Sequence, residues 1–340
     1  MIAAAPNGND WRVLFLCDAH AAMGFGHASR CLHLGKLVTR RLSPDGAGPV
    51  FAFQGSFSTG ARARLASAVP ELSLYTPTAS PRADVILIDR LADTEDPDAW
   101  DPGLVSEVRG RCGRVIYLAS GRTAPALPAG VECIGYQPGG PPARPPSIRW
   151  GLEYAPVAID DADPSAERDP TRALVALGGS RDDVALDLVL DVLEGMPEVE
   201  RIDVLLSPVN EHPAKAIPDR SRKAVFLHRN VPSVTPLLSR AGLVIASYGH
   251  LGWEALALGA PLCLIGQKRF QADLAAALAS AGLAISAGLA ERGANSRLYQ
   301  ALLQTLLERE PLSARAQAAV DGRGLARIAD IICQDLRGAR

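Results

Sequence analysis

A histidine in a glycine-rich loop is the residue of this chain best suited to move a proton. The apolar run of residues 12–17 is typical of a buried parallel strand, and Gly24, Gly26 and His27 follow it where a helical pattern begins. A helix N-terminus disfavours the imidazolium form, so His27 can accept a proton. We predict that His27 is a general base toward water or a hydroxyl. The motif alone fits a helix cap equally well, and the full fingerprint GxGxxG is absent.

A second stretch, residues 241–274, has the residue types of a nucleotide site. An apolar run ends in a polar turn of Ser247, Tyr248, Gly249 and His250, and a helical pattern follows in which Glu254 is the only charge before Gly259. A helix N-terminus after a parallel strand favours a phosphate, and a carboxylate accepts hydrogen bonds from ribose hydroxyls. We predict nucleotide binding here. A solvated glutamate in an ordinary strand-turn-helix unit is the alternative.

A third glycine-rich loop follows the apolar run of residues 173–177. Gly178, Gly179 and Ser180 could offer N–H groups and a hydroxyl to a phosphate, although no GK[ST] follows them as it does in a P-loop. A simple turn fits as well. Two carboxylates, Asp18 and Asp89, end strand candidates and are possible sugar-side residues, with loop capping as the alternative.

Metal chemistry has no sequence signature. His27 and His33 are six residues apart, off one helical face, and neither HExxH nor a paired-acid motif occurs. We expect neither a metal nor a cofactor.

These residues must be positioned by two runs of alternating strands and helices. Strand candidates at 12–17, 49–53, 85–88, 115–118 and 131–134 precede a Pro-rich stretch at 137–147, and a second alternation begins at residue 173 and ends in helices at 294–308 and 312–337. This pattern predicts an α/β fold of two Rossmann-like, doubly wound parallel-sheet domains facing a cleft. The predicted boundaries are a disordered leader at 1–10, an N-terminal domain at 11–150, a linker at 151–170 and a C-terminal domain at 171–340.

Composition limits the partners. The formal charge of −2 over 340 residues gives no electrostatic footprint for nucleic acid, and the six cysteines show no CxxC pairing. The chain begins without a basic and then apolar targeting segment, and eighteen apolar residues nowhere run together. We therefore expect a soluble, cytoplasmic protein without a membrane span.

Four segments together resemble one family. They are GFGHASRCLHLG, GLEYAPV, ALGGSRDD and SYGHLGWEALALGAP, and they follow one another along the chain in the order typical of that family. The family is the PseG/SpsG nucleotide-sugar hydrolases of pseudaminic acid biosynthesis, related to the MurG-like glycosyltransferases of the GT-B fold. The resemblance implies metal-independent hydrolysis of a UDP-linked 2,4-diacetamido-2,4,6-trideoxyhexose at its anomeric carbon, releasing UDP and the free sugar.

The same resemblance implies residue roles. His27 matches the family's catalytic histidine, Glu254 and the turn before it match the segment that holds phosphate and ribose, and Gln271 matches a glutamine beside the sugar. We also expect Gly24, Gly26 and Arg30 to bind the substrate.

Three positions depart from the family. Leu91 stands where a tyrosine usually follows Asp89, Ala119-Ser120-Gly121 replaces an Asp-Asp pair, and Phe270 replaces an asparagine. Two other functions therefore stay open: an inverting GT-B glycosyltransferase that uses a UDP-sugar and an acceptor hydroxyl, and a nucleotide-sugar-binding homologue without turnover.

Overall fold

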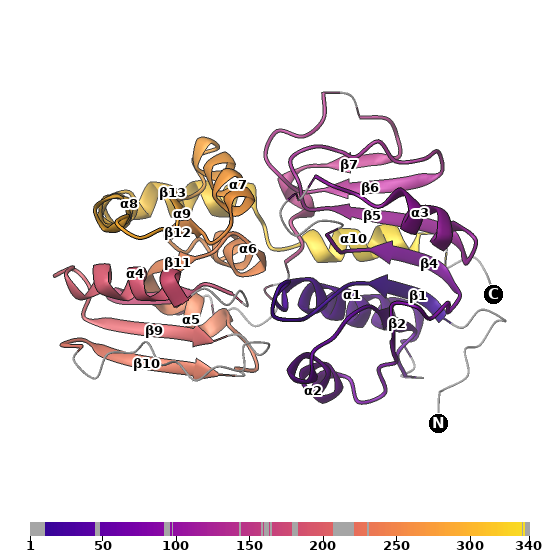
Figure 1. The fold of residues 1–340 in the computed structure, drawn as a ribbon, viewed down its shortest axis with the longest axis horizontal. Coiled ribbons are helices and arrows are strands. Elements are labelled where there is room, and N and C mark those ends of the chain that lie inside the picture. Colours follow the sequence, from indigo (N-terminus) through magenta and orange to yellow (C-terminus); the bar gives the residue numbers. More distant parts are fainter. Residues whose placement is uncertain are drawn as a thin grey trace. The chain divides into compact units, whose positions relative to one another are not determined.

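The computed structural model describes residues 11–44, 48–91, 96, 98–142, 144–157, 159, 163, 165–178, 183–206, 221–229, 231–334 and 336 (Figure 1). The predicted leader at 1–10 lies outside the described residues. The chain forms two compact units, one made of Met1–Pro156 with Arg323–Arg340 and the other of Val157–Gly322.

The first unit is built on a seven-stranded parallel sheet in the order β3-β2-β1-β4-β5-β6-β7. Its strands are β1 (Trp11–Leu16), β2 (Phe51–Gln54), β3 (Leu74–Tyr75), β4 (Ala83–Ile88), β5 (Cys112–Ala119), β6 (Val131–Gly135) and β7 (Ile148–Trp150). Its helices are α1 (Gly26–Leu42), α2 (Thr59–Ala68), α3 (Pro102–Arg109), the 3₁₀ turn η1 (Leu152–Tyr154) and α10 (Gly324–Cys333). The central strands β1 and β4 are almost wholly buried, as their continuous apolar sequences predict for strands covered on both faces.

The second unit has a six-stranded parallel sheet in the order β10-β9-β8-β11-β12-β13. Its strands are β8 (Asp169–Ala176), β9 (Arg201–Leu206), β10 (Ala224–Arg229), β11 (Ala241–Ala246), β12 (Leu262–Gly266) and β13 (Ile285–Leu289). Its helices are α4 (Asp183–Glu194), α5 (Thr235–Arg240), α6 (His250–Ala257), α7 (Arg269–Ser280), α8 (Asn295–Leu307) and α9 (Arg309–Ala319). The prediction of two parallel-sheet α/β units is confirmed.

The predicted domain boundaries differ from the two units in two places. The expected linker at 151–170 holds η1 of the first unit at its start and the first residues of β8 at its end, and the units divide between Pro156 and Val157. The expected C-terminal domain at 171–340 includes α10, which belongs to the first unit.

Helix α10 joins the first unit because its apolar face packs there. It lies beside α1 although the two helices are far apart in the sequence (Figure 1). The start of α10 lies close to the backbone of Ala155, since a Cβ on Gly324 would come within 1.8 Å of the Ala155 carbonyl oxygen. The side chain of Arg114 donates to the Ile331 carbonyl at 2.8 Å, and Arg12 donates to the Leu336 carbonyl at 2.9 Å. An amphipathic pattern alone could not reveal which unit the helix covers.

The single helix predicted at 312–337 is two helices. Gly322, between α9 and α10, has a φ of +73°, a left-handed conformation that favours glycine and ends a helix.

Candidate functional residues in each unit

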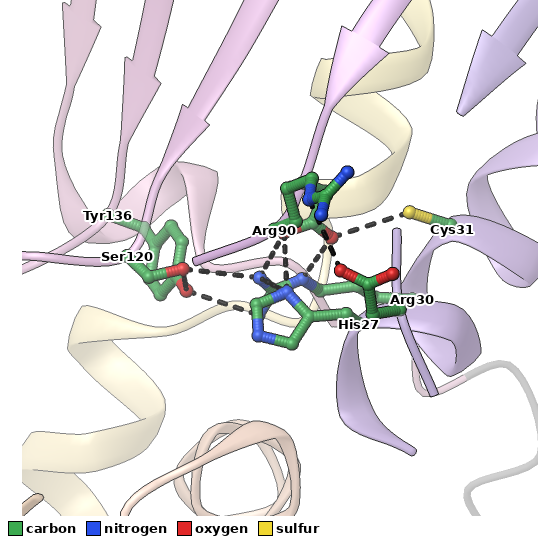
Figure 2. Close-up of polar contacts among 8 residues, drawn as sticks. His27, Arg30, Cys31, Arg90, Ser120 and Tyr136 are labelled. Carbon is green, nitrogen blue, oxygen red and sulfur yellow. Dashed lines mark hydrogen bonds and ion pairs between the residues drawn. The ribbon is translucent and has the colours of Figure 1, made fainter. Parts of the chain in front are cut away.

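In the first unit, the carboxyl ends of three adjacent strands bring polar side chains to the start of α1. Asp89 directly follows β4, Ser120 follows β5 and Tyr136 follows β6. Figure 2 shows Ser120 and Tyr136 on one side of the Arg30 and His27 side chains and Cys31 on the other. Parallel strands end at one edge of a sheet, which is where such folds bind ligands.

His27 contacts a buried carboxylate. Its Nδ1 lies 2.9 Å from Asp89 Oδ1; the Asp89 side chain is fully buried and 12% of the His27 side chain is exposed. When Nδ1–H donates to the carboxylate, the proton is held at Nδ1 and the lone pair is at Nε2. Asp89 therefore supports His27 in the arrangement that a general base needs.

Arg30 holds Asp89 in turn. Its Nε donates to Asp89 Oδ2 at 2.6 Å and its Nη2 donates to Oδ1, while Nη1 donates to the Tyr136 hydroxyl at 3.1 Å. Burial opposes ionisation of Asp89, but the charge of Arg30, followed by that of His27, brings the pKa of this carboxyl well below its usual range. Arg30, predicted from the sequence to bind substrate, lies buried among these groups, where its guanidinium keeps Asp89 ionised.

Asp18 is engaged in a loop contact. Its Oδ1 accepts a hydrogen bond from the Ser56 backbone N–H at 2.7 Å, and its Oδ2 lies 3.2 Å from Arg90 Nε. These contacts join the end of β1 to the segments after β2 and β4, which favours the loop-capping alternative for Asp18. The two predicted glycines lie nearby in the chain: Gly24 is buried in the turn after β1 and Gly26 is the first residue of α1.

In the second unit, the first turns of α6 carry an imidazole and a carboxylate side chain. His250 Nε2 lies 3.2 Å from Glu254 Oε1, one helical turn away, and both side chains are nearly buried. Among the described residues, no hydrogen-bond partner meets Glu254 Oε2 or His250 Nδ1. Buried polar atoms are ordinarily paired, so these two are well suited to a polar ligand.

The rest of the predicted turn precedes this pair. Ser247 and Tyr248 are buried, and Gly249 is the residue before the first turn of α6. A glutamine that the sequence pattern did not single out ties the turn to its neighbours: Gln267 Nε2 donates to Ser247 Oγ at 2.6 Å and to the Leu177 carbonyl. Gln267 directly follows β12, so its place at a strand end was the available signal.

Gln271, predicted beside the sugar, caps its own helix. Its Oε1 accepts hydrogen bonds from the backbone N–H groups of Gln267 at 2.9 Å and Lys268 at 3.1 Å. Gly178 is exposed at the end of β8 with a φ of +79°. The other two residues of that predicted phosphate loop, Gly179 and Ser180, lie outside the described residues.

Two further properties concern the described part of the chain. It contains no group of three or more histidine, cysteine, aspartate or glutamate side chains that could hold a metal ion. None of its helices combines the length and the apolar character needed to cross a bilayer.

Comparisons with known proteins show similarities of sequence and of fold. No protein-family model matches the sequence. The chain is 26% identical over 182 residues to the spore coat polysaccharide biosynthesis protein SpsG of Bacillus subtilis (strain 168), a match covering 51% of this chain and 53% of that protein. The match thus spans about half the length of that relative.

Solved structures are similar over almost the whole chain. MurG of Acinetobacter baumannii is 15% identical with a TM-score of 0.60, covering 95% of this chain and 99% of that one. The spinosyn rhamnosyltransferase SpnG, solved with thymidine diphosphate, is 16% identical with a TM-score of 0.58, covering 94% and 99%. The predicted resemblance to SpsG and MurG is therefore confirmed, and the fold is that of GT-B glycosyltransferase structures.

Proposed function

We propose that this chain is a nucleotide-sugar hydrolase: it cleaves the bond between the anomeric carbon of a UDP-linked amino-deoxy sugar and the diphosphate, with water as the acceptor. The observation that carries the proposal is the contact of His27 with the buried, ionised Asp89. Simple binding of a nucleotide sugar has no need of an oriented base. The similarity to SpsG, whose name refers to polysaccharide biosynthesis, supports a sugar substrate.

The proposed step moves one proton and one glycosyl group. His27 Nε2 takes a proton from water as the oxygen attacks the anomeric carbon, and the bond from that carbon to the diphosphate oxygen breaks with its electron pair on UDP. Asp89 stabilises the imidazolium that forms, since a carboxylate against Nδ1–H favours the charged ring. Loss of a general base lowers turnover by about 10²–10⁴-fold, which sets the size of the effect to be measured.

The second unit supplies the residues proposed to hold the nucleotide. Glu254 has a buried oxygen without a protein partner within the described residues, which suits the paired hydroxyls of a ribose. The backbone N–H groups at the start of α6, with Ser247 before them, suit the diphosphate. SpnG is similar in fold and was solved with thymidine diphosphate, which supports a nucleoside diphosphate as ligand.

A leaving diphosphate also needs its developing charge stabilised. Helix N-termini do this without a metal, because their N–H groups are fixed in place before the reaction. We propose this role for the start of α6 and for the loop of Gly178, Gly179 and Ser180.

An inverting glycosyltransferase is the second candidate. The observation that favours it is the near full-length similarity to a rhamnosyltransferase, whereas the match to SpsG covers about half of this chain. The same His27 and Asp89 would then activate an acceptor hydroxyl in place of water. A nucleotide-sugar-binding protein without turnover is the third candidate, and the oriented base counts against it.

One assay separates the three. Release of the nucleoside diphosphate, UDP or TDP, is measured from a panel of UDP-sugars and TDP-sugars without added acceptor, with and without a chelator, for the natural chain and for His27→Gln. Release that survives the chelator and is lost in His27→Gln supports the hydrolase. UDP binding without release, followed by release when hydroxyl acceptors are added, supports the transferase. Binding that never leads to release under either condition rules out both enzymatic proposals.

A further inference from the structure

One nitrogen of Arg30 has more hydrogen-bonding neighbours than hydrogens. Its Nη2 donates to Asp89 Oδ1, lies 3.2 Å from Ser120 Oγ and lies 2.9 Å from His27 Nδ1. A guanidinium nitrogen of this kind carries two hydrogens and accepts none. One of the three neighbours therefore goes without a hydrogen from Arg30.

The identity of that neighbour decides where the proton of neutral His27 is. If Arg30 donates to Nδ1, that nitrogen must carry a lone pair, and the ring proton moves to Nε2. If Nδ1 carries the proton, it donates to Asp89 Oδ1 at 2.9 Å, and Nε2 keeps the lone pair. Only the second tautomer of His27 has a free Nε2 to take a proton.

Asp89 keeps the first of the two hydrogens. Arg30 binds this carboxylate through both Nε and Nη2, and such a two-point contact between opposite charges is stronger than a bond between a cation and a neutral acceptor. The second hydrogen of Arg30 Nη2 is therefore donated to either Ser120 Oγ or His27 Nδ1.

Ser120 Oγ already acts as an acceptor in the hydrogen bonds around Arg30. Arg30 Nη1 donates to the Tyr136 hydroxyl at 3.1 Å, and that hydroxyl donates to Ser120 Oγ at 3.0 Å. Ser120 Oγ has a second lone pair, which suits the hydrogen of Nη2 (Figure 2). With this assignment every contact of Arg30 to Asp89, Tyr136 and Ser120 is satisfied, and Nδ1 of His27 is left to donate to Asp89.

We infer that Ser120 is a positioning residue that selects the tautomer of His27: by accepting the second Nη2 hydrogen of Arg30, it leaves the proton on Nδ1 and the lone pair on Nε2. The catalytic consequence rests on the proposed function, in which His27 is the base. The tautomer itself does not.

Substitution of Ser120 tests the inference directly. In Ser120→Ala the Nη2 hydrogen has lost its oxygen acceptor and turns to His27 Nδ1, which moves the ring proton to Nε2. Ser120→Thr keeps the hydroxyl and is the matched control. The readout is the pattern of ¹H–¹⁵N couplings of the histidine rings in ¹⁵N-labelled protein at about pH 8.5, two units above the ordinary histidine pKa. His27→Gln identifies which of the six histidines gives the His27 signals.

The expected result is an Nδ1–H ring in the natural chain and in Ser120→Thr, and an Nε2–H ring in Ser120→Ala. In the UDP-release assay, Ser120→Ala should lower kcat by about 10-fold or more while leaving KM unchanged, and Ser120→Thr should restore kcat; a full loss of base catalysis is about 10²–10⁴-fold.

An Nε2–H ring in the natural chain, or an Nδ1–H ring that persists in Ser120→Ala, overturns the inference whatever the activity. Failure of the proposed function has a different signature: the ring tautomer changes in Ser120→Ala as described, yet His27→Gln releases UDP as fast as the natural chain. If Ser120→Ala does not fold, an Nε2–H ring in Ser120→Thr, which keeps the acceptor, counts against the inference and an Nδ1–H ring there supports it.

Discussion

Asp89 Oδ1 lies 2.9 Å from His27 Nδ1, and this one contact joins the strand end that carries the carboxylate to the helix that carries the proposed base. The two residues are far apart in the chain, and the carboxylate has no exposed surface. The histidine is thus oriented by a group that substrate does not reach.

Replacement of Asp89 should lower turnover, which depends on the orientation of His27, and leave UDP binding nearly unchanged. In Asp89→Asn the amide keeps the size of the side chain but loses the charge that fixes Nδ1–H, so we expect kcat to fall by about 10²-fold or more and UDP affinity to change less than threefold. Steady-state UDP release and calorimetric titration with UDP measure the two quantities. Asp101→Asn, which alters only the cap of α3, is the control and should leave both unchanged.

The same substitution should lower stability. Without the carboxylate the buried Arg30 loses its ion pair, and breaking a buried pair by removing one partner costs about 3–5 kcal/mol. Urea denaturation measures the free energy of unfolding. A loss below about 1 kcal/mol would mean that Arg30 finds another partner or water.

Low pH should weaken the ion pair of Asp89 with Arg30, because it protonates the carboxylate. The folded-state pKa of Asp89 is lowered, so its contribution to stability is fully present above the unfolded value of 3.8 and is lost as the pH falls through the lower folded-state pKa. The natural chain should therefore lose stability more steeply below pH 3.8 than Asp89→Asn does. Parallel curves for the two proteins would show that Asp89 does not titrate there.

Removal of His27 should affect turnover alone. We expect His27→Ala to abolish UDP release and to leave UDP affinity within a few-fold, because the residues proposed to hold the nucleotide belong to the second unit. Near-normal release by this variant would show that another group takes the proton. His33→Ala, on the same helix, is the matched control.

Removal of Glu254 should affect nucleotide binding. Hydrogen bonds to a charged group are worth about 1.5–3 kcal/mol, so Glu254→Ala should weaken UDP by about tenfold to a hundredfold and weaken uracil little, since the base lacks the ribose. Titration calorimetry with both ligands measures this. Glu291→Ala removes an exposed ion pair with Arg297 and serves as the control. Unchanged UDP affinity in Glu254→Ala would place the ribose elsewhere.

The start of α10 should tolerate no side chain. A methyl group on Gly324 would meet the Ala155 carbonyl oxygen at 1.8 Å, so Gly324→Ala should destabilise the first unit by about 1–3 kcal/mol, as overpacking does. At Gly113 the nearest atom to an added Cβ is 3.5 Å away, and Gly113→Ala is the control. Equal unfolding curves for the two variants would show that α10 shifts without cost.

The sequence was sufficient for the elements that repeat a strong pattern. The runs at 12–17 and 243–246 became β1 and β11, and the polar residues after them lie at strand ends as predicted. The pattern missed β3 and β7, which have two and three residues, because two or three positions are too few to show an alternation of apolar and polar residues. It also missed β13, whose small residues resemble a loop.

The site was predictable in its residue types and less so in its contacts. His27 and Asp89 were both singled out, but the chain gave no means of knowing that one lies against the other, because the pairing depends on β4 lying next to β1. Arg30 was expected to bind substrate, and its ion pair with Asp89 was not predicted, since a buried charge requires a partner that only the folded sheet supplies. The contacts of Ser120 and Gln267 went unpredicted because single polar residues after short strands resemble turns.

Because α10 belongs to the first unit, that unit is completed only late in synthesis of the chain. The chain leaves that unit after Pro156 and re-enters it at Arg323. Domains fold from the N-terminus as the chain emerges from the ribosome. The seven strands of the first sheet are therefore made before any of the second unit, but the apolar surface beside α1 has no cover until all of Val157–Gly322 has been translated. The unit that begins first is the one completed last, so a ribosome that stalls within the second unit leaves the first with an open hydrophobic face.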